Sequence, residues 1–143
     1  MERMMKKRLA GYLVVGLIVG SLLLASGCGL KQLSSEKVSD LDYTVVDSDG
    51  IPEALMEEIE LQKESAFTLT YLDGDYLYLV RGYGEQETGG YSISVAELYL
   101  TEDAIYFETE LFGPKKGETV STAATYPYIV VKLERREEAV VFG

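Results

Sequence analysis

The chain has 143 residues, with 24 acidic and 13 basic side chains and a formal net charge of −11. It contains one cysteine and no histidine, which removes the commonest general base, the commonest zinc ligand and the Ser-His and Cys-His nucleophile pairs. Nucleic acid needs a basic surface, which this acidic chain does not offer. We therefore expect no catalytic residues, no metal, no cofactor and no nucleic-acid partner.

The N-terminal segment, residues 1–27, has the composition of an export signal. Four basic residues lie among the first eight, and an apolar run extends from Leu9 to Ala25. Small residues then precede the single cysteine in Ala25-Ser26-Gly27-Cys28. These are the three parts of a secretory signal peptide. The alternative is an uncleaved anchor, although the apolar run is slightly shorter than the roughly 20 residues that a span needs.

The tetrapeptide that ends at Cys28 resembles the lipobox of bacterial lipoprotein signal peptides. The resemblance implies cleavage before Cys28, acylation of that cysteine and attachment to the extracytoplasmic face of the cell membrane. Several acyl chains on one cysteine would make the attachment stable. Because four basic residues and one acidic residue lie in the signal, the remaining 116 residues carry nine basic and 23 acidic side chains, a net charge of −14.

The rest of the chain divides into a tether and one domain. Residues 28–40 are polar and are expected to form the lipidated tether, and residues 41–143 have the length of one small domain. A first strand is predicted at residues 43–46, followed by a turn at residues 47–50. One helix is predicted from Pro52 to Glu64, because Ile51, Leu55 and Ile59 form an apolar stripe on an acidic helix.

Residues 67–142 alternate with a period of two, which is typical of strands. Asp73-Gly74 is a hairpin signal between the first two of them. The strands are expected at residues 67–72, 76–80, 91–100, 104–112, 128–133 and 139–142. We therefore predict an α+β fold, an antiparallel sheet or partly closed β-barrel or sandwich of five to seven strands with one helix packed on a face.

Two segments with glycine or proline next to tyrosine stand out in this strand-rich region. The connection at residues 82–91 holds four glycines and two tyrosines, and the segment at residues 125–128 reads Thr-Tyr-Pro-Tyr. Glycine permits positive φ and close backbone approach, and Pro127 restricts Tyr126 to extended geometry. The first segment is either a bulged loop whose glycines only fold the chain or a rigid loop that presents Thr88 and Tyr91 to a partner.

Taken together, the two segments resemble the PrcB C-terminal domain family, which is named after a subunit of a surface protease complex. The matching residues are Gly84, Thr88-Gly89-Gly90-Tyr91-Ser92-Ile93, Gly113-Pro114 and Thr125-Tyr126-Pro127-Tyr128, within residues 66–134. The resemblance implies a non-catalytic, surface-attached module that binds or stabilises a secreted or surface protease or another envelope protein. The candidate partner-binding residues are Gly84, Thr88, Gly89, Gly90, Tyr91, Tyr126, Pro127 and Tyr128.

Three alternatives remain open. Residues 87–91 are similar to the Asn-Pro-Thr-Thr-Gly-Tyr loop of the chagasin-type cysteine-protease inhibitors, which implies an inhibitor-like binding module that uses the Thr-Gly-Gly-Tyr loop. A carboxylate-based hydrolase of envelope polymers would need two acids about 5–10 Å apart in a cleft. The acids available at close spacing are Glu57-Glu58, Glu108 with Glu110, and Glu137-Glu138. A small-ligand or envelope-sensing lipoprotein would need a deep apolar pocket.

Overall fold

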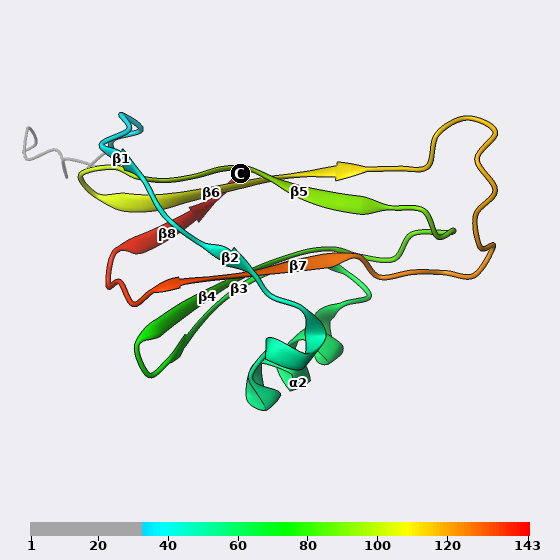
Figure 1. Ribbon diagram of the computed structural model, residues 1–143, viewed down its shortest axis with the longest axis horizontal. Helices are drawn as coiled ribbons and strands as arrows, with labels where there is room; N and C mark the ends of the chain where they lie inside the picture. The colour runs from blue at the N-terminus through cyan, green and yellow to red at the C-terminus, as the bar shows by residue number, and fades with distance from the viewer. Residues whose placement is uncertain (1–32) are drawn as a thin grey trace, which may run out of the picture. The chain divides into compact units, whose positions relative to one another are not determined.

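Alternating apolar residues build two four-stranded sheets, and one α-helix accompanies them (Figure 1). The computed structural model describes residues 33–143. The expected signal peptide, Cys28 and the first part of the expected tether lie outside these residues. Within the described part of the chain, no helix is long and apolar enough to cross a membrane.

The first sheet, sheet B, is fully antiparallel and has the order β2-β7-β4-β3. Its strands are β2 (Thr44–Val45), β7 (Tyr128–Glu134), β4 (Tyr76–Tyr83) and β3 (Ala66–Asp73). The predicted hairpin joins β3 to β4 through Gly74 and Asp75, with Gly74 at φ +57°. A glycine with positive φ at the first of two loop positions is what a type II′ hairpin turn requires.

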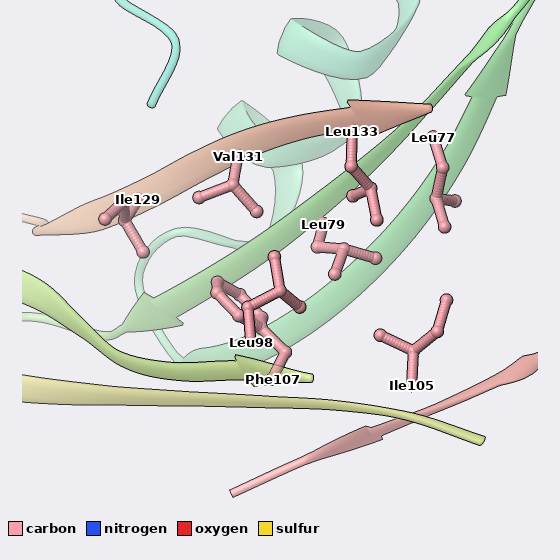
Figure 2. Packing of buried hydrophobic residues seen from close by; sticks show 8 residues of the cluster. All are labelled: Leu77, Leu79, Leu98, Ile105, Phe107, Ile129, Val131 and Leu133. Carbon is pink, nitrogen blue, oxygen red and sulfur yellow. The ribbon is translucent and has the colours of Figure 1, made fainter. Parts of the chain in front are cut away.

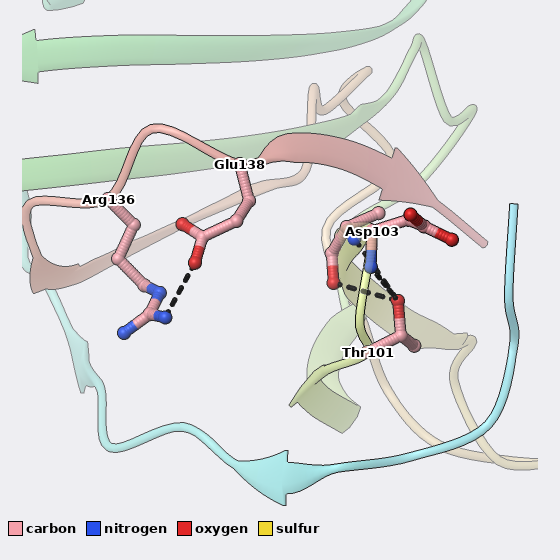
Figure 3. A network of polar contacts seen from close by, with 5 residues as sticks. Thr101, Asp103, Arg136 and Glu138 are labelled. Atoms are coloured by element: carbon pink, nitrogen blue, oxygen red, sulfur yellow. Dashed lines mark hydrogen bonds and ion pairs between the residues drawn. The ribbon is translucent and has the colours of Figure 1, made fainter.

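The second sheet, sheet A, is mixed and has the order β1-β5-β6-β8. Its strands are β1 (Ser39–Asp40), β5 (Ser92–Leu100), β6 (Ala104–Phe112) and β8 (Ala139–Phe142), and β8 pairs with β6 in parallel. The buried Thr101 closes the β5–β6 turn, because its hydroxyl accepts hydrogen bonds from the backbone N–H groups of Asp103 and Ala104 (Figure 3). The turn lies between the strands predicted at residues 91–100 and 104–112.

The main hydrophobic core lies between the two sheets (Figure 2). Both sheets direct every second side chain into it, as strand geometry dictates. Sheet A contributes Leu98, Ile105 and Phe107, and the ring of Phe107 packs edge-on against Phe142, with the ring centroids 5.9 Å apart. Sheet B contributes Leu77, Leu79, Ile129, Val131 and Leu133.

A second core lies on the other face of sheet B, beneath helix α2 (Glu53–Gln62). The three residues of the predicted apolar stripe, Ile51, Leu55 and Ile59, are all buried there. They pack against Phe67, Tyr78, Val80 and Val130 from the sheet. Sheet B is therefore covered on both faces, by sheet A and by the helix, and the prediction of one helix packed on a face is confirmed.

The expected number of five to seven strands is wrong, because residues 33–143 contain eight. The additional strand is β1, whose residues Ser39 and Asp40 belong to the predicted tether. Two polar residues show no apolar alternation, and their pairing with Tyr99 and Leu100 is a backbone interaction that leaves no sequence signal. The two sheets also stay separate instead of joining as a partly closed barrel, so the α+β sandwich is the correct form of the prediction.

Candidate functional site

The connection at residues 84–91 and the segment at residues 125–128 lie side by side at one end of the sandwich, on the right of Figure 1. Gln86 and Thr125 exchange two backbone hydrogen bonds, with N···O distances of 2.8 and 3.0 Å. The backbone N–H of Tyr83 donates to the carbonyl of Pro127 at 3.0 Å and extends this pairing toward the sheet. The structure therefore brings together two segments that are roughly 40 residues apart in the sequence.

The glycine-rich connection is also held by the loop that precedes Thr125. The hydroxyl of Thr125 donates to the carbonyl of Thr88 at 2.7 Å, and the N–H of Gly89 donates to the carbonyl of Ser121 at 2.9 Å. The hydroxyl of Thr88 is directed at the carbonyl of its neighbour Gly89. The glycine-rich connection is thus braced along one side. We name residues 84–91 with residues 113–128 the loop end.

Two of the candidate glycines are required by the backbone. Gly84 has φ +76° and is buried, and a Cβ there would lie 3.0 Å from the backbone nitrogen of Ala66. Gly90 has φ +85°, and a Cβ there would lie 2.5 Å from Cγ1 of Val120. Other residues rarely adopt this left-handed region. These glycines shape the loop end.

Tyr126 and Tyr128 attach the loop end to the helix side of sheet B. The hydroxyl of Tyr126 donates to Oε2 of Glu85 at 3.3 Å, and Nζ of Lys63 lies 5.3 Å from the centre of its ring. The negative charge of Glu85, followed by burial, raises the pKa of Tyr126. Burial likewise raises the pKa of Tyr128, whose hydroxyl points at Sδ of Met56 at 3.8 Å. Both phenols therefore stay protonated at neutral pH and act as hydrogen-bond donors.

A groove of about 410 Å³ opens beside the loop end, on the edge of the sandwich where β2 is short. Three candidate residues line it, namely Tyr91, Pro127 and Tyr128. The opposite wall comes from residues 45–48, which the sequence did not suggest as part of a site. All peptide bonds of the described residues are trans, so Pro127 is trans. The groove is lined by aromatic, apolar and neutral polar groups, and Asp47 is its one carboxylate.

The candidate residues do not all have the same accessibility. Gly90 is exposed, Thr88, Tyr91, Tyr126 and Pro127 are half-buried, and Gly84 is buried. The close acidic pairs of the hydrolase alternative lie elsewhere, on α2, on β6 and in the β7–β8 connection. Within residues 33–143, no cluster of three or more carboxylate, thiol or imidazole groups could hold a metal ion.

Sequence reasoning missed two features of this end of the molecule. The hydroxyls of Tyr83 and Thr109 are 2.6 Å apart, and this hydrogen bond links β4 of one sheet to β6 of the other. Val120 and Ser121 press against Gly90 and Gly89. The run Gly113-Pro114 marked a loop here, but no local pattern indicates which distant segment that loop contacts.

Comparison with known proteins gives one match. The model of the family described as PrcB C-terminal matches residues 77–134, from β4 to the end of β7. The matched range contains all eight candidate residues of the loop end and confirms the resemblance that the two motifs indicated. A search of curated proteins and a search of solved structures found no significant match.

Proposed function

We propose that the chain, whose residues 77–134 match the family model described as PrcB C-terminal, is a lipid-anchored accessory module. It binds or stabilises a secreted or surface protease, or another envelope protein, and has no catalytic activity of its own. The anchor is the acylated Cys28, so the module acts on the extracytoplasmic face of the membrane.

The observation that carries this proposal is the bracing of the loop end. The bonds from Gln86, Thr88 and Gly89 to residues 121–125 fix a chain segment that would otherwise be a long free loop. A surface that is already ordered binds a partner without a large loss of conformational entropy. Next to it, Tyr91 and Tyr126 offer aromatic side chains of the type that is enriched at protein interfaces.

The same bracing favours a docking surface over the inhibitor-like alternative. A loop that enters a protease cleft must project from its scaffold with its side chains free. Here Gly90 packs against Val120 and Pro114, and the hydroxyl of Thr88 donates a hydrogen bond to the backbone carbonyl of Gly89. The single carboxylate of the adjacent groove likewise gives no support to a carboxylate-pair hydrolase at this place.

The experiment is chemical cross-linking on intact cells that carry the full chain, followed by capture and identification of the attached proteins. We expect a secreted or surface protease among them. The Tyr91→Ala variant should lower its yield about tenfold, as expected when an aromatic contact worth about 1.4 kcal/mol is lost. The matched control is Tyr43→Ala, because Tyr43 is 41% exposed and lies outside the loop end.

A second measurement separates an accessory module from an inhibitor. Deletion of the gene should lower the amount of active protease on the cells if the module stabilises it, and should raise the activity if the module inhibits it. Equal cross-linking of the wild-type chain and a folded Tyr91→Ala variant would contradict the role of the loop end. Attached proteins without any protease would contradict the class of partner.

A further inference from the structure

Strand β3 forms an edge of sheet B that lacks the usual protection. Its residues 66–72 read Ala-Phe-Thr-Leu-Thr-Tyr-Leu, with no charge, proline or glycine. All eight residues of β3 pair with β4 without a register shift, whereas β5 carries a bulge between Val95 and Glu97. In natural proteins, charges, prolines or bulges normally prevent an edge strand from pairing with other chains.

The register shows which backbone groups of β3 are free. Successive residues of an antiparallel strand direct their N–H and C=O groups to opposite sides. Because Tyr83 bonds to Pro127 on the β7 side, its neighbour Gly82 faces β3, and Phe67, the partner of Gly82, faces β4. The backbone N–H and C=O groups of the residues that alternate with Phe67, Leu69 and Tyr71 therefore point away from β4. These residues are Ala66, Thr68, Thr70 and Leu72, and no hydrogen bond to their backbone groups forms outside the sheet ladders of the described chain.

A groove of about 610 Å³ runs along this free edge. One wall carries the side chains of Thr70 and Leu72, and the other carries Val140 and Phe142 of β8, the edge strand of sheet A. A strand added to β3 would place every second side chain over this space between the sheets, whose lining is about half polar and includes Arg136, Glu137 and Glu138. Leu72, which is 42% exposed, would become buried in such a complex.

The rim of the edge is acidic. Glu64 precedes β3, Asp73 ends it and Asp75 follows in the turn, and none of them forms an ion pair within residues 33–143. Lys63 pairs with Glu60, Arg136 pairs with Glu138, and Arg135 pairs with Glu137 and also donates to the carbonyl of Gly74. Arg81, opposite the middle of β3 at Thr68, forms no ion pair within residues 33–143 and lies over the ring of Tyr83, away from the acidic ends of the strand. A bound segment with basic ends would complement this rim. A second copy of β3, centred on Leu69, would instead bring Asp73 next to Ser65 and Glu64 of the first.

We infer that the β3 edge binds an extended segment of a partner protein as a further antiparallel strand. The segment is uncharged and alternates apolar and small polar residues over about six positions, with lysine or arginine at both ends. Its main-chain groups pair with Ala66, Thr68, Thr70 and Leu72, and its inward side chains fill the groove between β3 and β8. This surface is separate from the loop end, so the inference does not depend on the proposed function.

The test uses the full chain in detergent and two labelled peptides that differ only in their ends. One is Lys-Lys-Thr-Val-Thr-Ile-Thr-Val-Lys-Lys, and the other has glutamate in place of each lysine. Fluorescence anisotropy should show at least tenfold tighter binding of the lysine peptide. On binding, amide hydrogen exchange should slow at Ala66, Thr68, Thr70 and Leu72. Equal binding of both peptides, no binding of either, or slowed exchange elsewhere would overturn the inference.

Thr70→Pro removes an N–H that makes no bond within the sheet and should weaken binding of the lysine peptide at least tenfold. Ser35→Pro, in the exposed segment before β1, is the matched control and should bind as the wild type does. If Thr70→Pro does not fold, Thr70→Lys places a charge on the same edge and should have the same effect. A folded Thr70→Lys variant with wild-type affinity would overturn the inference. So would a wild-type dimer in sedimentation that Thr70→Lys dissociates, because the edge would then serve a second copy.

Discussion

At the scale of single residues, the structure distinguishes two glycines that have nearly the same backbone conformation. Gly90 and Gly117 have φ values of +85° and +82°. A Cβ on Gly117 would meet no atom within 4 Å, whereas one on Gly90 would lie 2.5 Å from Cγ1 of Val120 and 3.0 Å from Cβ of Pro114. Alanine at Gly117 therefore measures backbone strain alone, and alanine at Gly90 adds a steric clash.

We expect Gly117→Ala to lower the free energy of unfolding by about 1–2 kcal/mol, the cost of a left-handed alanine. Gly90→Ala should lower it by a further 1–3 kcal/mol or so, the usual cost of overpacking. Urea denaturation of both variants measures the difference. Equal losses would mean that the loop at residues 113–125 gives way, and that it does not brace the glycine-rich connection as tightly as the hydrogen bonds indicate.

Glu138 should contribute to the pH dependence of stability. Its hydrogen bond with Arg136, at 2.6 Å, lowers the pKa of Glu138 below its ordinary value of 4.5, and backbone N–H groups add to this shift (Figure 3). A carboxyl whose pKa is lowered by folding stabilises the native state above its unfolded pKa. That contribution is lost as the pH falls through the folded pKa. Glu138→Gln should thus cost stability at about pH 7 and cost less at about pH 3.

Urea midpoints at the two pH values test this expectation. The control is Glu137→Gln, whose carboxylate pairs with Arg135 but is 77% exposed and should contribute little at either pH. A loss of the same size at both pH values in Glu138→Gln would contradict the electrostatic origin of the effect.

At the scale of the elements, helix α2 offers a matched pair of leucines. Leu55 is 1% exposed, in the core between helix α2 and sheet B, and Leu61 is 81% exposed on the same helix. Leu55→Ala should lower the free energy of unfolding by about 2–5 kcal/mol, because it removes buried methyl groups and leaves a cavity. Leu61→Ala should change it by less than about 0.5 kcal/mol. Similar losses for both would mean that the helix does not pack on the sheet through the stripe that contains Leu55.

How far the sequence predicts each element depends on whether its signal is local. The helix and the hairpins were predictable because Leu55 and Ile59 recur with the helical period and because Gly74 marks a turn. The parallel pairing of β8 with β6 was not, since nothing in residues 139–142 indicates which strand they join. The same limit applies to the site. The motifs indicated two special segments, but the bonds between Gln86 and Thr125 and between Tyr126 and Glu85 depend on the tertiary fold.

At the scale of the whole molecule, the structure is a three-layer arrangement in which sheet B lies between sheet A and the helix. The loop end and the β3 edge are different surfaces of this framework, one made of bonded loops and the other of unpaired backbone. A partner protein could therefore contact both in one complex. We propose that a lipid on Cys28, a residue outside the described part of the chain, holds the acidic domain at the membrane where such a partner is found.

Cys28→Ala tests that assignment. Lipid chains hold a protein on a bilayer by about 0.8 kcal/mol per buried CH₂ group, and the net charge of −14 gives the domain no attraction of its own for anionic lipid. We expect the wild-type chain to sediment with membranes. Cys28→Ala should be released as a soluble domain once its N-terminal segment has been cleaved. Ser35→Ala, in the exposed segment before β1, is the control and should stay with the membranes. If Cys28→Ala sediments with membranes after the N-terminal segment has been removed, a lipid on Cys28 is not the anchor, and the domain must bind the envelope through one of its own surfaces.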